Sequence, residues 1–131
     1  MPTIVRKSFS TIETRRDILQ AVSWHVRSSV WAPPTDVYET DDTYVVKVEI
    51  AGMRDEDFDV AFENNTLWIS GYRPDLNERR AYHQMEIRFG RFELAVEISV
   101  PVDFENGSAE YKDGFLMIVF PKSNKKQEKV E

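Results

Sequence analysis

The sequence predicts an all-β fold in which one antiparallel β-sandwich follows a short N-terminal arm. Three observations lead to this prediction. Apolar and polar residues alternate in several short stretches between residues 35 and 122, turn residues separate these stretches, and no helical periodicity lies between them. Alternation with a period of two directs one set of side chains into a core and the other set into solvent. Short strands joined by turns in this way are typical of two packed antiparallel sheets.

The most apolar stretch, FLMIVF at residues 115–120, is expected to be a central strand. Asp113 and Gly114 before it form a two-residue turn signal, and Pro121 after it cannot donate to a ladder. Alternate residues should face the core (Leu116, Ile118 and Phe120), and those between should face the other way (Phe115, Met117 and Val119). A strand that is apolar on both faces needs cover on both. We therefore expect the second face to contact a partner segment or a bound ligand.

Five other strands are expected; the first is short, and the other four each have one apolar face. They are Thr35–Thr40, Thr43–Ile50, Phe58–Phe62, Thr66–Tyr72 and Arg91–Ser99. Asn64 and Asn65 read as the turn between the third and fourth of these strands. Residues 73–80 are polar and rich in turn residues, which predicts an exposed loop. The segment Tyr82–Phe89 has polar residues on both faces and reads either as an edge strand or as loop.

Residues 1–32 differ from the rest and are expected to form an arm. Asp17 can cap a helix whose apolar residues fall on one stripe, namely Ile18, Leu19, Val22 and Val26, with Trp24 nearby. This helix could pack on its own domain, serve in self-association, or bind a partner. A membrane-surface role is disfavoured because the polar face has few cations. Pro33 and Pro34 open the β domain at 33–122, and the polar tail 123–131 is expected to be disordered.

Composition excludes several classes of function. The formal net charge of −6 argues against a nucleic-acid binder, because no surplus of cations exists to neutralise phosphates. The chain has no cysteine, no apolar segment typical of a secretory signal near its start, and no apolar run of the ~20 residues that span a bilayer. A cytoplasmic protein is expected.

Motifs for catalysis or cofactor binding are also lacking in the sequence. His25 and His83 have no cysteine or second histidine at metal-ligand spacing. The acidic run at residues 55–57 lacks the spaced oxygen ligands and the glycine of a calcium loop. No phosphate-binding loop or nucleophile elbow is present, and no two carboxylates can be paired as acid and base. We expect no enzyme activity, no metal, no cofactor and no small-molecule substrate.

The chain resembles the small heat-shock protein family, whose members share an α-crystallin domain. The most specific match is the pattern A-x-x-x-x-G-x-L, which is formed by Ala109, Gly114 and Leu116. Supporting matches are PPTDVYE at residues 33–39, VEIAGM at 48–53, LWISG at 67–71, the Phe-Gly pair at 89–90 followed by a phenylalanine at 92, and Pro-Lys at 121–122. The resemblance covers residues 33–122 and implies an immunoglobulin-like sandwich.

The resemblance further implies an ATP-independent holdase, which binds partly unfolded client proteins and prevents their aggregation. It implies a dimer in which one subunit's edge segment adds to the partner's sheet, and larger assemblies built by the arms. The segment would be Tyr82, His83, Gln84, Met85, Glu86, Ile87 and Arg88. We expect clients or arms to contact Ile18, Leu19, Val22, Trp24, Val26, Phe115, Met117 and Val119.

Two departures from the family pattern affect assembly. The family usually has an arginine two residues after the phenylalanine of G-x-F, where this chain has Leu94. Its C-terminal arm normally carries Ile-x-Ile, whereas residues 123–131 offer only Val130. Assembly through the tail is therefore expected to be weak. Two other functions stay open: an adaptor that recognises one folded partner, as β-sandwich co-chaperones do, and a purely structural assembly protein.

Overall fold

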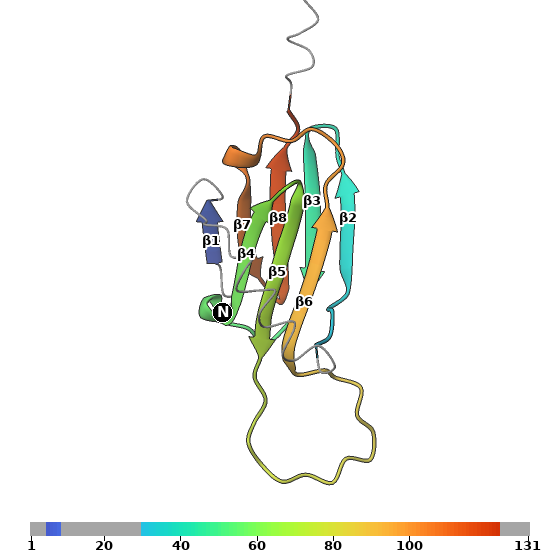
Figure 1. Cartoon of the computed structure of the whole chain (residues 1–131). Coiled ribbons are helices and arrows are strands. Elements are labelled where there is room, and N and C mark those ends of the chain that lie inside the picture. Colours follow the sequence, from blue (N-terminus) through green and yellow to red (C-terminus); the bar gives the residue numbers. More distant parts are fainter. Residues whose placement is uncertain (1–4, 9–29, 124–131) are drawn as a thin grey trace, which may run out of the picture.

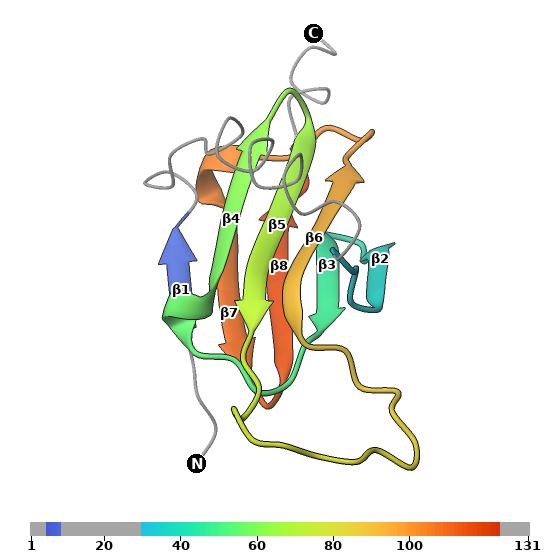
Figure 2. The same ribbon diagram turned by 60° about the horizontal axis from the view of Figure 1, so that its bottom comes forward.

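Two antiparallel sheets pack face to face in the computed structural model, which describes residues 5–8 and 30–123 (Figures 1 and 2). The first sheet has the order β1-β7-β8-β3-β2 and the second the order β4-β5-β6. The five-stranded sheet consists of β1 (Val5–Ser8), β2 (Thr35–Glu39), β3 (Thr43–Glu49), β7 (Ser108–Lys112) and β8 (Phe115–Pro121). The three-stranded sheet consists of β4 (Phe58–Glu63), β5 (Thr66–Arg73) and β6 (Gly90–Glu97). Two short 3-10 helices, η3 (Asp55–Asp57) and η4 (Phe104–Asn106), lie in connections.

The core lies between the sheets and consists of the inward residues that the alternation predicts. Strand β8 shows this clearly, because Leu116, Ile118 and Phe120 are buried while the residues between them are half-buried. The other predicted strands contribute Tyr44, Val46, Val48, Ile50, Phe58, Val60, Leu67, Ile69, Phe92 and Ile98. Leu94 and Val96 pack against this cluster and are partly buried. The predicted all-β sandwich is confirmed.

Two hairpins close through two-residue turns with positive φ. Asn64 and Asn65 connect β4 to β5 with φ of 55° and 62°, and Asp113 and Gly114 connect β7 to β8 with φ of 53° and 87°. These angles match the twist of the flanking strands, which is why Asn-Asn and Asp-Gly favour such turns. The Gly114 carbonyl also accepts a 2.8 Å hydrogen bond from the Ile50 backbone N–H. This turn therefore connects to the end of β3.

Replacing Gly114 by valine is expected to destabilise the domain by about 1–3 kcal/mol. A β-branched residue is strained at φ +87°, and its β-carbon would lie 3.4 Å from Cβ of Ala51. Gly114→Asn should cost less, because asparagine tolerates positive φ. Thermal unfolding followed by circular dichroism compares the two variants. Equal melting temperatures for valine, asparagine and glycine would contradict this role of the turn.

Two segments that the sequence analysis placed in the arm join the sandwich. β1 pairs antiparallel with β7, from Val5 opposite Tyr111 to Ser8 opposite Ser108, and so occupies one edge of the five-stranded sheet. Trp31 is only 7% exposed, forms a bridge to Phe92 of β6, and meets the ring of Phe92 edge-on with centroids 5.8 Å apart. β1, before residues 9–29, and Trp31, after them, are thus attached at opposite long sides of the sandwich, beside β7 and beside β6 (Figure 1).

Further expectations concern the loop at residues 73–80, the segment 82–89, the arm and the tail. The loop at residues 73–80 is exposed beyond Arg73, as predicted. Residues 82–89 form no strand, so the alternative of an edge strand is not realised within this one subunit. The predicted helix stripe of the arm and the tail beyond residue 123 lie outside the described residues. Within the described ranges, no helix is long and apolar enough to cross a membrane.

Candidate interaction surfaces

The outer face of the five-stranded sheet carries a strip of apolar side chains. Phe115, Met117 and Val119 project from β8 and remain half-buried. Across the sheet, Val45 of β3 pairs with Val119, and Tyr38 of β2 pairs with Val45; Val45 is only 4% exposed, whereas Tyr38 is 42% exposed. We call these five residues the outer strip. The predicted second face of β8 thus exists, and no described segment lies over it in Figures 1 and 2.

Charged residues border the outer strip. Lys47 pairs with Met117 across the sheet, and its Nζ lies 4.6 Å from the centroid of the Phe115 ring. On the other side of β8, Glu110 pairs with Met117 and Lys112 with Phe115. A cation over an aromatic face is attracted by the ring quadrupole. The strip is therefore a narrow apolar surface between side chains of both signs, which suits contact with extended amphipathic chain.

The segment 82–88 is exposed over its whole length and forms neither helix nor strand. Three of its side chains are large and apolar: Tyr82 is 48% exposed, Met85 63% and Ile87 64%. Met85 and Ile87 are two residues apart and Tyr82 is off that register, and among the described residues no strand pairs with the segment. Exposed backbone N–H and C=O groups in extended chain are ready to pair with a sheet edge.

Such an edge is present at β2. This strand has a hydrogen-bonded neighbour, β3, on one side only within the described part of the chain. Val37 and Tyr38 on β2 are 43% and 42% exposed. The other edge of the same sheet differs, because β1 pairs with β7 there. The described part of one subunit therefore contains an unpaired segment, residues 82–88, and an unpaired sheet edge, β2. The segment does not pair with β2 of its own subunit.

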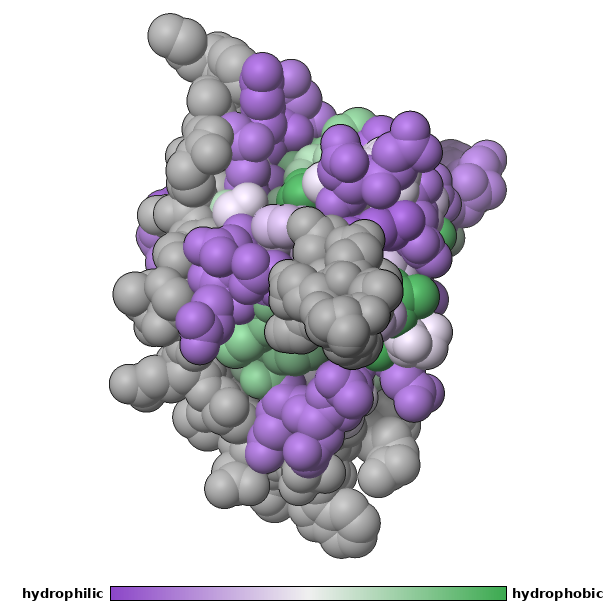
Figure 3. All heavy atoms as spheres, turned by 90° about the horizontal axis from the view of Figure 1, so that it is seen from above, coloured by the Kyte–Doolittle hydropathy of each residue, from purple (hydrophilic) through white to green (hydrophobic). Residues whose placement is uncertain are grey.

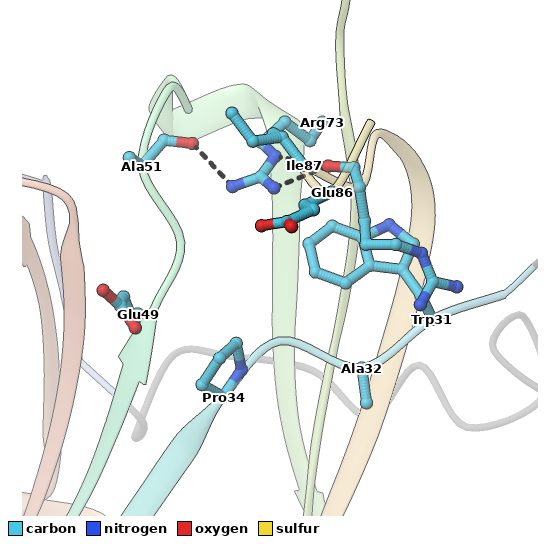
Figure 4. A pocket seen from close by; sticks show the side chains of 9 residues that line it. Trp31, Ala32, Pro34, Glu49, Ala51, Arg73, Glu86 and Ile87 are labelled. Atoms are coloured by element: carbon cyan, nitrogen blue, oxygen red, sulfur yellow. Dashed lines mark hydrogen bonds between the residues drawn. The ribbon is translucent and has the colours of Figure 1, made fainter. Parts of the chain in front are cut away.

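A hollow of about 510 Å³ lies at the base of the loop that carries residues 82–88 (Figure 4). Its lining comes from segments far apart in the sequence: Trp31, Ala32, Pro34, Glu49, Ala51, Arg73, Glu86, Ile87 and Arg88. Arg73, from the end of β5, lies at the centre of this arrangement. Its Nε donates to the carbonyl of Arg88 at 2.9 Å, and its Nη1 donates to that of Ala51 at 3.3 Å.

Stacking completes the environment of Arg73. The guanidinium lies 4.8 Å from the Trp31 ring centroid and 5.5 Å from that of Phe89, while the Arg88 guanidinium lies 5.6 Å from Trp31. Arginine suits this position because its planar fork hydrogen-bonds two carbonyls and stacks on an aromatic ring at once. Arg73 therefore fixes where the loop leaves the domain. Sequence reasoning missed this cluster, because its partners are 15–42 residues apart along the chain and no local pattern joins them.

The far part of the same loop is organised by Arg80. It forms ion pairs with Asp75 at 3.3 Å and with Glu78 at 2.8 Å, and it donates a 2.7 Å hydrogen bond to the Tyr82 hydroxyl. Hydrogen bonds to Tyr82 and then Glu78 raise the pKa of Arg80 above its usual value. Exposed pairs of this kind contribute little to stability singly. Together they give the loop a preferred shape just before residues 82–88.

Other features of the described residues offer little for chemistry. No group of three or more His, Cys, Asp or Glu side chains lies together in the ranges 5–8 and 30–123. Burial, and then the Glu39 carboxylate, raise the pKa of Tyr44, which lies in the core. The end of the sandwich seen in Figure 3 presents mainly hydrophilic side chains, with small apolar areas between them.

The residues of the A-x-x-x-x-G-x-L pattern have structural roles. Ala109 and Leu116 are buried in the core, and Gly114 takes the positive φ of the turn between them. Between Ala109 and this turn, Tyr111 is buried and its hydroxyl donates 2.8 Å to the carbonyl of Ile50. The same hydroxyl accepts a 3.3 Å hydrogen bond from the Met53 backbone N–H. The pattern thus describes the β7–β8 hairpin and its attachment to β3.

Comparisons with known proteins agree with this fold. The model of the Hsp20/alpha crystallin family matches residues 36–131. Small heat shock protein C4 of Rickettsia felis is 30% identical over 107 residues, which is 80% of this chain and 66% of that protein. Heat shock protein 16 of Schizosaccharomyces pombe is 34% identical over 104 residues, which is 75% of this chain and 71% of that protein. The match thus spans slightly less than two thirds of the Rickettsia relative.

Solved structures agree as well. Heat shock protein 16.0 from Schizosaccharomyces pombe superposes with a TM-score of 0.62 at 30% identity, over 70% of this chain and 86% of that one. HSP18.5 from E. histolytica gives a TM-score of 0.65 at 25% identity, over 72% and 92% of the two chains. The family match covers the whole sandwich from β2 onward, including the loop with residues 82–88. The chain therefore belongs to the Hsp20/alpha crystallin family of small heat shock proteins.

Proposed function

We propose that this protein is an ATP-independent holdase, which binds partly unfolded client proteins and keeps them from aggregating. Membership of the small heat shock family supports a chaperone role. The observation that carries the proposal is the outer strip, an apolar surface on a strand whose other face already fills the core. Partly unfolded chains expose apolar side chains, and such a strip buries them without any need for nucleotide. A cytoplasmic location is part of the proposal.

Clients would lie along β8, against Phe115, Met117 and Val119. These side chains keep part of their apolar area accessible, and each one that a client covers contributes up to ~1.5–3 kcal/mol. A few such contacts give binding that is broad and reversible, because no deep pocket selects one sequence. The arm residues Ile18, Leu19, Val22, Trp24 and Val26 are kept in the proposal as a second contact surface.

We also propose that two subunits form a dimer by exchanging the segment 82–88. In this arrangement the residues from Tyr82 to Arg88 of one subunit pair with the free edge of β2 in the other. Support comes from the exposed backbone of the segment, its apolar side chains, and the one-sided pairing of β2. Exchange of identical elements gives a closed two-fold dimer in which the β2 edge of each subunit is paired. Larger assemblies would then be built through the arms.

The holdase proposal predicts that the protein suppresses heat-induced light scattering of several unrelated clients without ATP. A subunit concentration equal to or above the molar concentration of client chains should remove most of the scattering, because each subunit offers one strip. Suppression for a single partner only would favour the adaptor, and assembly without any suppression would favour a structural protein. A requirement for ATP would contradict the proposal.

A pair of variants connects the activity to the outer strip. Met117→Glu places a charge at the middle of the strip and should weaken suppression severalfold, because burying that carboxylate is costly. Ser99→Glu makes the same new side chain at an exposed position just after β6, in the other sheet and away from the strip, and should leave suppression near the wild-type level. Circular dichroism and native mass, measured for both, exclude misfolding or altered assembly as the cause.

A further inference from the structure

The middle of the outer face on β4 and β5 is more buried than an open face should be, whereas Tyr72 at the end of β5 and Ala95 and Glu97 on β6 are exposed. On β4 and β5 the inward residues belong to the core, so Ala61 and Ser70 face outward. Yet Ala61 is 1% exposed and Ser70 2% exposed. The five-stranded sheet covers only the opposite face, and no described element packs over this one (Figures 1 and 2).

The neighbours of these residues do not explain such burial. In the register of the sheet, Trp68 lies beside Ala61 and can shade it, but Ser70 lies between Asp59 and Glu93. A serine flanked by two acidic side chains on an open sheet face is expected to stay accessible to water. In addition, Oε1 of Glu63 is screened from solvent and has no hydrogen-bond partner among the described residues. A buried carboxylate oxygen requires a donor.

The path of the chain points to what covers this face. The segment 9–30 begins at the end of β1, beside β7, and ends at Trp31, which bridges to β6. These two attachment points flank the three-stranded sheet on opposite sides (Figure 2). Crossing three strands spaced ~4.8 Å apart is a shorter route than crossing the five strands of the other sheet. As α-helix, a segment of this length would reach ~30 Å, which is enough for the crossing.

Charge and polarity complement each other between the face and this segment. The outer face carries the carboxylates of Asp59, Glu63, Glu93 and Glu97, and one cation, Arg91, at its end. The segment 9–29 supplies the cations Arg15, Arg16 and Arg27 and contains two anions, Glu13 and Asp17, so it carries a small net positive charge. Its apolar residues Ile18, Leu19, Val22 and Val26 share one stripe at helical spacing, which matches the apolar pair that Ala61 and Trp68 form across β4 and β5. Ala95, the next residue of that row on β6, is exposed and lies outside the docked area.

We propose that residues 9–29 dock across the outer face of the β4-β5-β6 sheet of their own chain. The apolar stripe covers Ala61, Trp68 and Ser70, and the arginines pair with the surrounding carboxylates. In this state the arm's apolar stripe and the sheet face conceal each other. The docked stripe is the same surface that the proposed function offers to clients, so a client would compete with docking, and the test of docking is made without a client.

Thiol labelling tests the docking directly, because the chain contains no cysteine of its own. In Ser70→Cys the single thiol reports access to the middle of the face. With the arm intact, reaction with a thiol reagent should be slow, and removal of residues 1–29 should accelerate it at least tenfold. Val46→Cys, at the centre of the core, should react slowly in both chains. Equal Ser70→Cys rates with and without the arm would overturn the proposal.

Point variants keep the test valid if the truncated chain fails to fold. Val22→Asp, in the Ser70→Cys background, places a charge in the apolar stripe and should raise the labelling rate severalfold. Gln20→Asp adds the same side chain off the stripe, and the rate should stay unchanged. An equal effect of both variants would overturn docking through the stripe.

A dilution series distinguishes docking of the chain's own arm from docking of an arm that belongs to another subunit. Protection of the Ser70→Cys thiol by its own arm should not depend on protein concentration across the range in which assemblies dissociate. A labelling rate that rises on dilution in step with dissociation would assign the cover to another subunit and overturn the proposal.

Discussion

Deletion of residues 80–86, replaced by a short Gly-Ser link, is expected to convert the protein into monomers that retain their β-sandwich. If the dimer forms by exchange of this segment, the deletion removes the strand that each subunit contributes. Sedimentation should give the monomer mass, and circular dichroism should keep its β character, because none of these residues belongs to a strand. Arg88 is retained because its carbonyl accepts the hydrogen bonds of Arg73.

Substitutions on the same loop provide a matched control. Ile87→Asp puts a charge on the exchanged segment and should weaken the dimer, because a side chain that the partner's sheet would cover becomes costly to bury. Leu76→Asp makes the same change at an apolar residue that is 70% exposed and lies outside the segment, and the mass should not change. A dimer that survives the deletion would show that the subunits associate through another surface.

Gly71→Ala is expected to be the most destabilising single substitution of a small residue in this domain. A β-carbon there would overlap the carbonyl oxygen of Asp57 and lie 2.7 Å from Cζ of Phe92. Gly71 pairs with Phe58 on one side and with Phe92 on the other, so the two rings occupy the space above it. Overpacking of this kind costs roughly 3 kcal/mol when backbone must move, which lowers the melting temperature by about 10–20 °C.

Two further variants identify the cause of this loss. Tyr72→Ala changes the next residue on β5, which is exposed, and should alter stability by less than about 1 kcal/mol. Phe92→Leu in the Gly71→Ala background shortens the contacting ring but leaves the Asp57 carbonyl in place, so it should not restore stability. Rescue by Phe92→Leu would contradict the role of the backbone contact. Thermal unfolding of the full chain decides both points.

The strands of the sandwich were predictable because their information is local. Alternation in Thr43–Ile50 and in the stretch after Gly114 directs Val46, Val48, Leu116 and Ile118 inward, and the structure buries all four. The turns were equally predictable, since Asn-Asn and Asp-Gly accept positive φ at low cost. The apolar second face of β8 followed from the same alternation. For the strands and for the second face of β8, the period of two within a single strand is sufficient.

The interaction surfaces were predictable only in part. The exposed segment 82–88 could be recognised by its composition, but its lack of a partner in one subunit is visible only when all strands are placed. Arg73 and Trp31, which stack on each other, are 42 positions apart, and no local sequence pattern around either residue predicts the contact. Long-range contacts of this kind depend on how strands are ordered, which alternation does not specify.

By itself, the sequence determined that the protein is an all-β sandwich, which residues form its core, where its hairpins turn, and that β8 is apolar on both faces. These properties follow from side-chain periodicity and from the few residues that accept positive φ. Only the tertiary structure decided that β1 joins the edge at β7, that Trp31 enters the core beside β6, and that Ser70 is buried on the outward side of β5. Their physical cause is sheet order, because edges, neighbours and covered faces arise only after distant segments have paired.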